Sequence, residues 1–228
     1  MRCSTLFLAV GLLALSGLQC SPVGGPGDGA RNDGAKISTS RVMRDVRLKV
    51  DLVPKGTHGR KVVRPMRPRY ITIHSTQNWT AGAERHSLAL KRGALRSPKR
   101  RGGNRIGYLI WHFTVDEKMA IQHMPTSEQG EHADFGGPGN RYSIGIEMCE
   151  ERGSNLRATV ERTAKLTAVM MKQKGIPLRN VVPHYHWPRR GKTPANKNCP
   201  HFLLDNGRPG RKWNAFQSKV NYYYQRLE

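Results

Sequence analysis

The sequence predicts a single α/β domain built on a central mixed β-sheet that is flanked by helices. Segments rich in β-branched and aromatic residues recur at 69–76, 107–115, 119–124 and 142–149, as is typical of strands. Helical segments alternate with them, the clearest at 154–174, and 228 residues suffice for one such domain with appendages. We therefore expect a groove over the strand ends, where α/β folds place their sites.

The N-terminus predicts export. Residues 1–20 combine a short basic start with an apolar run that is too short to span a bilayer comfortably, which is typical of a signal peptide. Cys20 is a candidate for a lipid anchor, and plain cleavage without lipidation stays open. Residues 21–45 are rich in Gly, Pro, Asp and Asn and predict a disordered tether before the main domain at 46–228. We expect a protein of the periplasm, the outer membrane or the extracellular space.

The first part of the domain predicts a lead-in, a strand, a helix and a loop. Residues 43–68 are basic with three prolines and predict an irregular segment. Strand alternation over 69–76 puts His74 at the C-terminal end of a strand. Residues 80–90 predict a helix, opened by a threonine. Residues 91–105 are rich in Lys and Arg, and a solvated insertion and an electrostatic role both stay open.

The rest of the chain alternates short strands with helices. Residues 154–174 carry apolar side chains at helical spacing and end before Gly175 and Pro177. The other expected elements are strands at 107–115, 119–124, 142–149 and 181–182, a Gly-rich loop at 129–140 and a helix at 212–227.

A carboxylate stands inside the strand at 142–149. Period-two alternation places Ile144, Ile146 and Met148 on a core face and Glu147 on the other face, beside small residues. A buried carboxylate is costly unless it is paired or functional. Glu147 is therefore a catalytic candidate, with a structural ion pair as the alternative.

The stretch at 180–202 offers metal-site chemistry. It holds three histidines, Lys197 and Cys199 on a Pro-rich loop. Two imidazoles, with His74 and His184 as the candidates, and one thiolate would make a zinc site that keeps a position open for water. A nearby carboxylate can take a proton from water, and a lysine can stabilise an oxyanion.

Six motifs in this order resemble those of the zinc-dependent N-acetylmuramoyl-L-alanine amidases of the second amidase class. That family shares a fold with peptidoglycan recognition proteins and phage amidase lysozymes. The resemblance covers about residues 51–204, with the core motifs at 69–204, and is strongest to secreted and prophage-type Bacillus enzymes. The motifs are Tyr-Ile-Thr-Ile-His74-Ser-Thr, Trp-His112-Phe-Thr-Val-Asp, Ile121-Gln-His-Met-Pro, Glu131-His132-Ala133-Asp, Gly139-Asn140-Arg-Tyr-Ser-Ile-Gly-Ile-Glu147-Met-Cys149, and His184 through Lys197-Asn-Cys199-Pro200.

The resemblance implies a hydrolase that uses Zn²⁺ to cleave the amide between N-acetylmuramic acid and L-alanine in peptidoglycan. The zinc ligands that it implies are His74, His184 and Cys199. It makes Glu147 the catalytic carboxylate and Lys197 the cation that stabilises the oxyanion. The residues expected along the substrate groove are His132, Asn140 and Trp111.

Two departures from the family pattern leave rivals. Fifteen positions separate His184 from Cys199, more than in the Bacillus-type relatives, and the extra residues at 188–196 are basic and Pro-rich. We prefer Lys197 as the oxyanion cation because it keeps the Lys-x-Cys-Pro pattern. The lysine that competes with Lys197 is Lys192. The second departure is His186, which stands where the family pattern has a polar residue, often Asp, and competes with His184, the histidine that we prefer. His201 matches no ligand position and is expected on the surface.

The cysteines allow two interpretations. Cys3 and Cys20 lie in the signal, which leaves Cys149 and Cys199 in the domain. In an exported protein two cysteines suggest one disulfide. The alternative is that Cys199 ligates a metal while Cys149 is a buried thiol, and the resemblance argues for this free Cys149.

The net charge of +23 predicts attraction to polyanions, among them nucleic acid, acidic lipid and anionic wall polymers. A nucleic-acid role is disfavoured because residues 91–105 lack interleaved aromatic residues and the signal directs the chain out of the cell. A non-catalytic peptidoglycan-binding module of the same fold is the other alternative, but such modules usually lack the cysteine ligand. We expect peptidoglycan as the partner, no nucleic acid, and a monomer.

Overall fold

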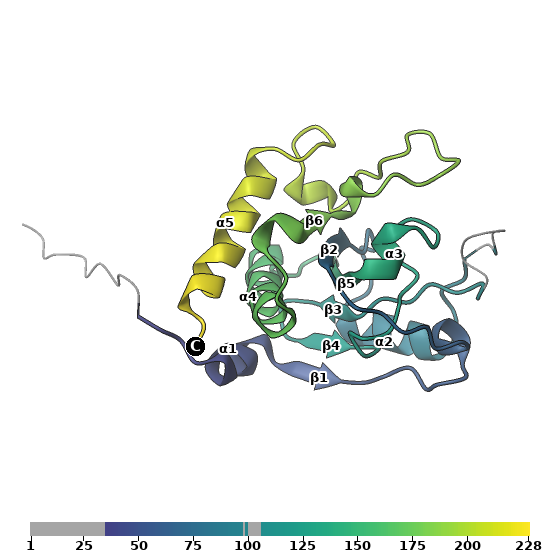
Figure 1. Cartoon of the computed structure of the whole chain (residues 1–228), viewed down its shortest axis with the longest axis horizontal. Helices are drawn as coiled ribbons and strands as arrows, with labels where there is room; N and C mark the ends of the chain where they lie inside the picture. Colours follow the sequence, from purple (N-terminus) through teal and green to yellow (C-terminus); the bar gives the residue numbers. More distant parts are fainter. Residues whose placement is uncertain (1–34, 98, 100–105) are drawn as a thin grey trace, which may run out of the picture. The chain divides into compact units, whose positions relative to one another are not determined.

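A mixed sheet of six strands organises the part of the chain that the computed structural model describes, namely residues 35–97, 99 and 106–228. The strand order is β1-β4-β3-β5-β2-β6, and only β3 and β4 pair antiparallel (Figure 1). The expected mixed α/β fold is therefore confirmed. The strands are β1 (Leu48–Val50), β2 (Tyr70–Ser75), β3 (Phe113–Val115), β4 (Ala120–Gln122), β5 (Ser143–Met148) and β6 (Val181–Pro183).

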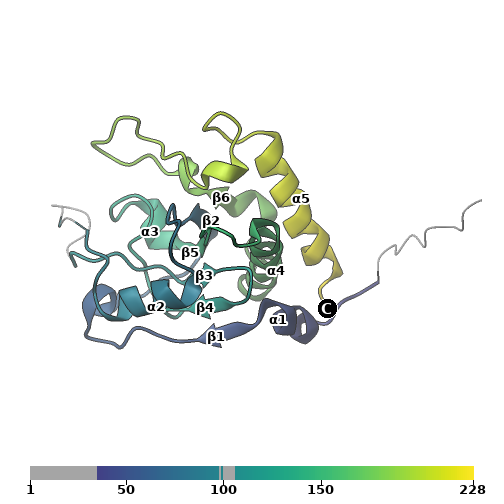
Figure 2. The ribbon, with the colours of Figure 1, turned by 180° about the vertical axis from the view of Figure 1, so that it is seen from behind.

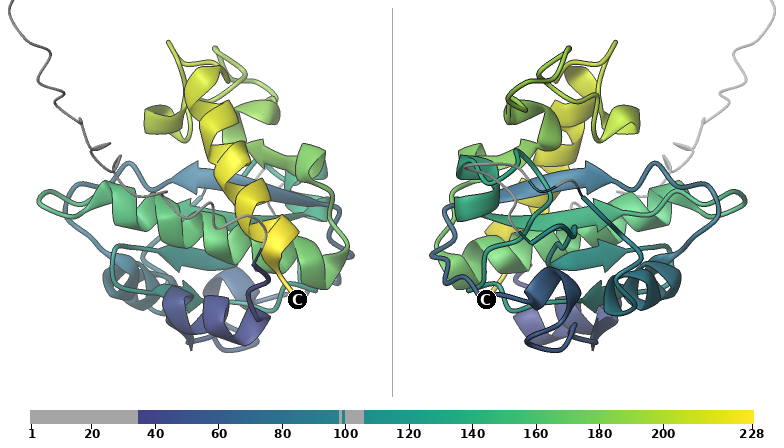
Figure 3. Two further views of the ribbon diagram at one scale, coloured as in Figure 1. Left: turned by 90° about the vertical axis from the view of Figure 1, so that its left-hand side faces the viewer. Right: turned by 90° about the vertical axis from the view of Figure 1, so that its right-hand side faces the viewer.

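Helices cover both faces of this sheet. α4 (Leu156–Lys174) and α5 (Arg211–Arg226) lie together on one face, and α1 (Thr39–Val46) packs against α4 (Figures 2 and 3). α2 (Ala83–Lys91) covers β3 and β4 from the opposite face, and the short α3 (Pro138–Tyr142) contacts β2 and β5. Short 3-10 turns complete the fold at His58–Arg60, Leu178–Asn180, His184–His186 and His201–Leu203.

The pairing of β2 with β5 sets up the site. The two strands run parallel, and His74 is the register partner of Glu147. Ile71, Ile73 and the isoleucines of β5 join the core cluster that also contains buried residues of α4. Because side chains alternate along a strand, His74 and Glu147 both point to the opposite face. The predicted core face of residues 142–149 is thus confirmed, and two polar side chains meet at one end of the sheet.

The structure corrects several expected elements. Residues 43–68 are not merely irregular, because they contain the end of α1 and the strand β1, which pairs parallel with β4. α1 also overlaps the tether expected at 21–45. The strand expected at 107–115 is formed only from Phe113 onward, after isolated bridges at Tyr108 and Ile110. The loop expected at 129–140 ends inside α3.

Some predictions concern residues that the structure does not describe. These are the signal and lipid-anchor predictions at 1–20, the first part of the tether, and the tip of the basic loop at 98 and 100–105. In the described part of that loop, the guanidinium of Arg96 lies over the ring of Tyr108, 4.4 Å from its centroid. Among the described residues, no helix combines the length and the apolar composition needed to cross a membrane.

Candidate active site

Three neighbouring strands carry the first three functional side chains to one end of the sheet. Glu147 lies near the end of β5, His74 near the end of β2, and His184 directly follows β6. The Nδ1 atoms of His74 and His184 are 2.9 Å apart, and Oε1 of Glu147 is 3.7 Å from Nδ1 of His74. Since these strands are parallel, residues far apart in sequence meet at their C-terminal ends.

Cys199 completes the cluster from a loop. Its Sγ accepts a hydrogen bond from the backbone N–H of Ser75 at 3.3 Å, and its carbonyl accepts one from the N–H of Tyr185 at 3.0 Å. One nitrogen of His74, one of His184 and the Cys199 sulfur all lie within 4.8 Å of one another. Hydrogen bonds therefore join Cys199 both to β2, which carries His74, and to the turn that carries His184.

Hydrogen bonds fix which ring nitrogen of each histidine carries the proton. Nε2 of His184 is 2.8 Å from the carbonyl oxygen of Ala133, which can only accept, so Nε2–H donates. Nε2 of His132 likewise faces the carbonyl of Ser143 at 3.4 Å, which leaves its Nδ1 as an acceptor. That Nδ1 receives the Nε2–H of His74 at 3.0 Å. In both His74 and His184 the lone pair is therefore on Nδ1.

Two imidazole lone pairs thus face each other at 2.9 Å, an arrangement that is repulsive unless a cation lies beside them. Burial lowers the pKa of His74 well below its usual value and that of His184 to about 3, so both rings are neutral, as metal ligands must be. Burial raises the pKa of the Cys199 thiol to about 12, and a bound metal would reverse this by stabilising the thiolate. Two nitrogens and one sulfur, with both imidazoles held by hydrogen bonds from their other nitrogen, fit Zn²⁺.

Glu147 is placed to exchange a proton. Its Oε2 is buried and has no hydrogen-bond partner among the described residues, while 13% of the side chain is exposed to the pocket. Burial raises the pKa of this carboxyl to about 7, the charge of Lys197 opposes the rise, and Glu150 adds to it. A carboxylate with a pKa near neutrality is suited to general acid–base catalysis.

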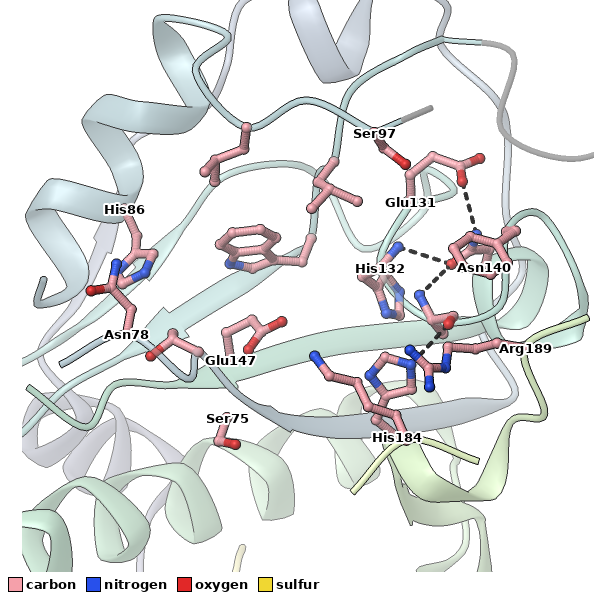
Figure 4. A pocket seen from close by; sticks show the side chains of 17 residues that line it. Ser75, Asn78, His86, Ser97, Glu131, His132, Asn140, Glu147, His184 and Arg189 are labelled. Atoms are coloured by element: carbon pink, nitrogen blue, oxygen red, sulfur yellow. Dashed lines mark hydrogen bonds between the residues drawn. The ribbon is translucent and has the colours of Figure 1, made fainter. Parts of the chain in front are cut away.

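A pocket of about 300 Å³ opens beside these residues (Figure 4). Glu147 lies between an end marked by Asn78 and His86 and an end marked by His184 and Arg189 (Figure 4). Lys197 also lines the pocket, whereas Lys192 is exposed and does not. The structure therefore favours Lys197 over its rival as the cation of the site.

Comparison with known proteins identifies the family of this chain. Residues 64–202 match the family Amidase_2, described as N-acetylmuramoyl-L-alanine amidase. The chain belongs to this family. The resemblance drawn from the six motifs is thereby confirmed.

Two curated relatives of this amidase-family chain come from Bacillus subtilis strain 168. The N-acetylmuramoyl-L-alanine amidase CwlH is 35% identical over 178 residues, which are 77% of this chain and 62% of the relative. The amidase XlyA is 35% identical over 173 residues, which are 75% of this chain and 50% of the relative. The chain thus spans between half and two thirds of the length of these two relatives.

Solved structures of the family match almost over their whole length. A mutant endolysin from Bacillus subtilis superimposes with a TM-score of 0.63 at 34% identity, covering 77% of this chain and 99% of the endolysin. The catalytic domain of XlyA gives 0.61 at 35% identity, with the same two coverages. The fold predicted from the sequence is that of these enzymes.

The three residues expected along the groove all line the pocket of this amidase-family chain, but each is engaged inside the protein. The Nε1–H of Trp111 donates to Oγ1 of Thr114 at 2.7 Å. Oδ1 of Asn140 accepts from the backbone N–H groups of His132 and Ala133, and its Nδ2 donates to Glu131. Both ring nitrogens of His132 are also paired. Their contact with substrate stays a prediction.

The two other histidines of the 180–202 stretch, His186 and His201, lie outside the cluster of candidate ligands. His186 is exposed and packs its ring against Trp187, outside the ligand cluster. His201, expected on the surface, is only 30% exposed, because its Nε2 lies 2.5 Å from Oε2 of the buried Glu150. Sequence reasoning missed this pair, which links the segment after Cys199 to the residues that follow β5.

The two cysteines of the domain are not joined to each other. Both Cys149 and Cys199 are free and buried, so the alternative of a disulfide between them is not realised. Cys149 packs with Ala83 of α2 and Ile121 of β4, and its sulfur is 3.8 Å from Nδ1 of His86. It does not line the pocket. Cys149 is therefore a buried thiol of the core, as the resemblance implied.

Proposed function

We propose that this chain is a zinc-dependent amidase that hydrolyses the bond between N-acetylmuramic acid and L-alanine in peptidoglycan. The observation that carries the proposal is the pair of facing Nδ1 lone pairs of His74 and His184, beside Cys199 and the pocket-lining carboxyl group of Glu147. Membership of the N-acetylmuramoyl-L-alanine amidase family supports the choice of bond.

The zinc ligands in this proposal are Nδ1 of His74, Nδ1 of His184 and Sγ of Cys199. When bound, zinc supplies a Lewis acid that polarises a carbonyl and eases the ionisation of water. His132 and the carbonyl of Ala133 hold the two imidazoles in the required tautomer and orientation.

The chain's own residues divide the remaining work. Glu147, whose side chain lines the pocket and is 13% exposed, accepts a proton from the attacking water and then gives it to the leaving amine. Lys197 supplies the positive charge that faces the carbonyl oxygen as negative charge develops there. The ring of Trp111 lines the pocket and is almost wholly buried. It thereby helps to exclude bulk water from the reacting groups.

The decisive variant is Glu147→Gln. It keeps the size of the side chain and removes its basicity, so turnover should fall by roughly 100- to 10,000-fold while zinc stays bound. Release of stem peptides from purified muropeptides is followed by mass spectrometry, with and without a chelator, and zinc is counted by metal analysis. His186→Gln is the matched control and should change neither quantity, because this ring is exposed. A Glu147→Gln protein that cleaves at the normal rate would contradict the mechanism.

A non-catalytic peptidoglycan-binding module is the alternative. Such a module needs neither a third ligand nor a free carboxylate, and both Cys199 and Glu147 are in place here. If metal analysis finds no zinc in the protein and muropeptides stay intact, the binding module replaces the enzyme.

We also propose export, supported by the apolar run after Met1-Arg2. The full chain should fractionate with the membrane if Cys20 is lipidated, and Cys20→Ser should release it. If native protein and variant are both soluble outside the cytoplasm, the anchor is excluded and cleavage alone remains. Retention of the native chain in the cytoplasm would contradict export itself.

A further inference from the structure

The loop between Trp187 and Lys197 closes on itself at Arg189. The backbone N–H of Arg189 donates to the carbonyl of Ala195 at 2.9 Å, and its Nε and Nη2 reach the carbonyls of Ala195 and Pro194, both at 3.3 Å. The residues at 190–194 are exposed, whereas Arg189 is half-buried and lines the pocket. The extra residues of this loop therefore hold one guanidinium group at the pocket wall.

The charged side chains that line the pocket differ in whether they have a partner of opposite charge among the described residues. Glu131 is satisfied, because one oxygen lies 2.5 Å from the guanidinium of Arg64 and the other accepts from Asn140 at 2.9 Å. Arg64 itself does not line the pocket. Two further charged residues there, Glu147 and Lys197, interact with each other electrostatically.

Arg189 is the cation that remains. In the described part of the chain no carboxylate lies within 4.0 Å of it, and its side chain donates hydrogen bonds to the neutral carbonyls of Ala195 and Pro194. A guanidinium group offers five N–H donors in a planar fork that suits a carboxylate. A ligand of this pocket is therefore expected to bring a carboxylate to Arg189.

The position of Arg189 gives the pocket a direction. It lies at the end marked by His184, on the far side of Glu147 from His86 (Figure 4). The end near His86 is lined by uncharged side chains, among them Asn78 and Trp111, whose ring lies 6.2 Å from that of His86. Leu95 and Leu109, which pack in the cluster of Trp111, also line the pocket. One end thus favours an anionic group, and the other favours an uncharged one.

The substrate of the proposed reaction has the same asymmetry. The carboxyl group of N-acetylmuramic acid is consumed in the scissile amide, so the sugar side carries no charge, whereas the stem peptide carries carboxylates. We infer that Arg189 binds a carboxylate of the stem peptide, so that the peptide extends toward the His184 end and the sugar toward Trp111. This inference rests on the proposed function, and it makes Arg189 a specificity-determining residue.

The test compares two muramyl tripeptides of one sequence, one with free stem carboxylates and one with each converted to a carboxamide. Native enzyme should prefer the free acid. Arg189→Gln should raise KM for the free acid by roughly 10- to 100-fold, the range expected for a hydrogen-bonded charge pair, with kcat nearly unchanged. It should leave the carboxamide substrate unaffected. Arg189→Lys should recover part of the loss, because it keeps the charge but not the fork.

Arg190→Gln and Lys192→Gln are the matched controls, since both residues lie on the same loop and are exposed. Three outcomes would overturn the inference. One is an equal loss on both substrates, which would mean that Arg189 only holds its loop. The second is an equal effect of the control variants, which would mean a general field. The third is no effect of Arg189→Gln at all. Failure of the native enzyme to cleave either substrate would instead overturn the proposed function.

Discussion

The Nε2 proton of His74 goes to a single acceptor, Nδ1 of His132. Without it, His74 would be free to rotate or to move its proton to Nδ1, the nitrogen proposed to bind zinc. His132→Phe should therefore weaken zinc binding by about 10- to 100-fold, the usual cost of losing such a supporting partner. Competition with a chromogenic zinc chelator measures the change.

His132→Gln tests the cause, because its amide oxygen can again accept the hydrogen bond from Nε2–H of His74 and should restore part of the affinity. His186→Phe is the control and should bind zinc like the native chain, since it lies outside the cluster. Native-like zinc affinity in His132→Phe would show that His74 keeps its tautomer without this partner.

At the level of single residues, alternation along a strand was enough to place Glu147 on the site face and its isoleucine neighbours in the core. The role of His132 could not be predicted in this way, because its ring meets that of His74 across 58 positions of sequence. Arg189 was hidden for a different reason. It stands in a basic run, and only the closure of the loop singles out this residue from its neighbours.

The strand β5 depends on having no side chain at Gly145. A Cβ built there would meet three ring atoms of His132 at 2.9 Å, and the N–H of Gly145 donates to Nδ1 of His112 at 2.9 Å. Gly145→Ala should therefore push His132 away and lower the free energy of unfolding by about 1–3 kcal/mol, as overpacking does. Urea unfolding measures this change.

A double variant provides the control for the clash at β5. Adding His132→Ala removes the ring that the new methyl group meets, so Gly145→Ala should cost much less in that background. If the two changes are simply additive, the glycine is needed for something other than the close approach of His132.

At the level of elements, strong local signals were confirmed and weak ones were missed. β2, β5 and α4 carry long runs of apolar residues at strand or helix spacing, and their expected bounds hold within one or two residues. β1 has three residues, one of them a lysine, and is held mainly by its pairing with β4. α3 begins with Pro and Gly, which predict a loop, and forms where it packs on β2 and β5. Tertiary contacts thus decided the elements that local sequence did not.

On the scale of the whole molecule, buried neutral imidazoles couple folding to pH. Burial lowers the pKa of His112 to about 4 and that of His123 to about 3. In the unfolded chain the pKa of each of these histidines is near 6.5. Between pH 6.5 and the lower pKa of the folded state, the unfolded chain therefore binds more protons than the folded chain. Stability therefore falls as the pH drops below about 6.5, by roughly 1.4 kcal/mol per pH unit for each such histidine.

His123 offers the cleanest test, because it lies away from the proposed zinc ligands. Its Nε2 is 2.8 Å from Oγ1 of Thr114, and its surroundings contain both Asp51, whose charge raises its pKa, and Lys91, whose charge lowers it. These two neighbours are paired with each other at 2.7 Å, so burial dominates. His123→Gln should reduce the slope of the unfolding free energy against pH between pH 6.5 and 4 by about 1.4 kcal/mol per pH unit, which corresponds to one proton. Urea unfolding at several pH values, after metal has been removed with a chelator, gives that slope. An unchanged slope would mean that His123 takes up its proton within the folded state.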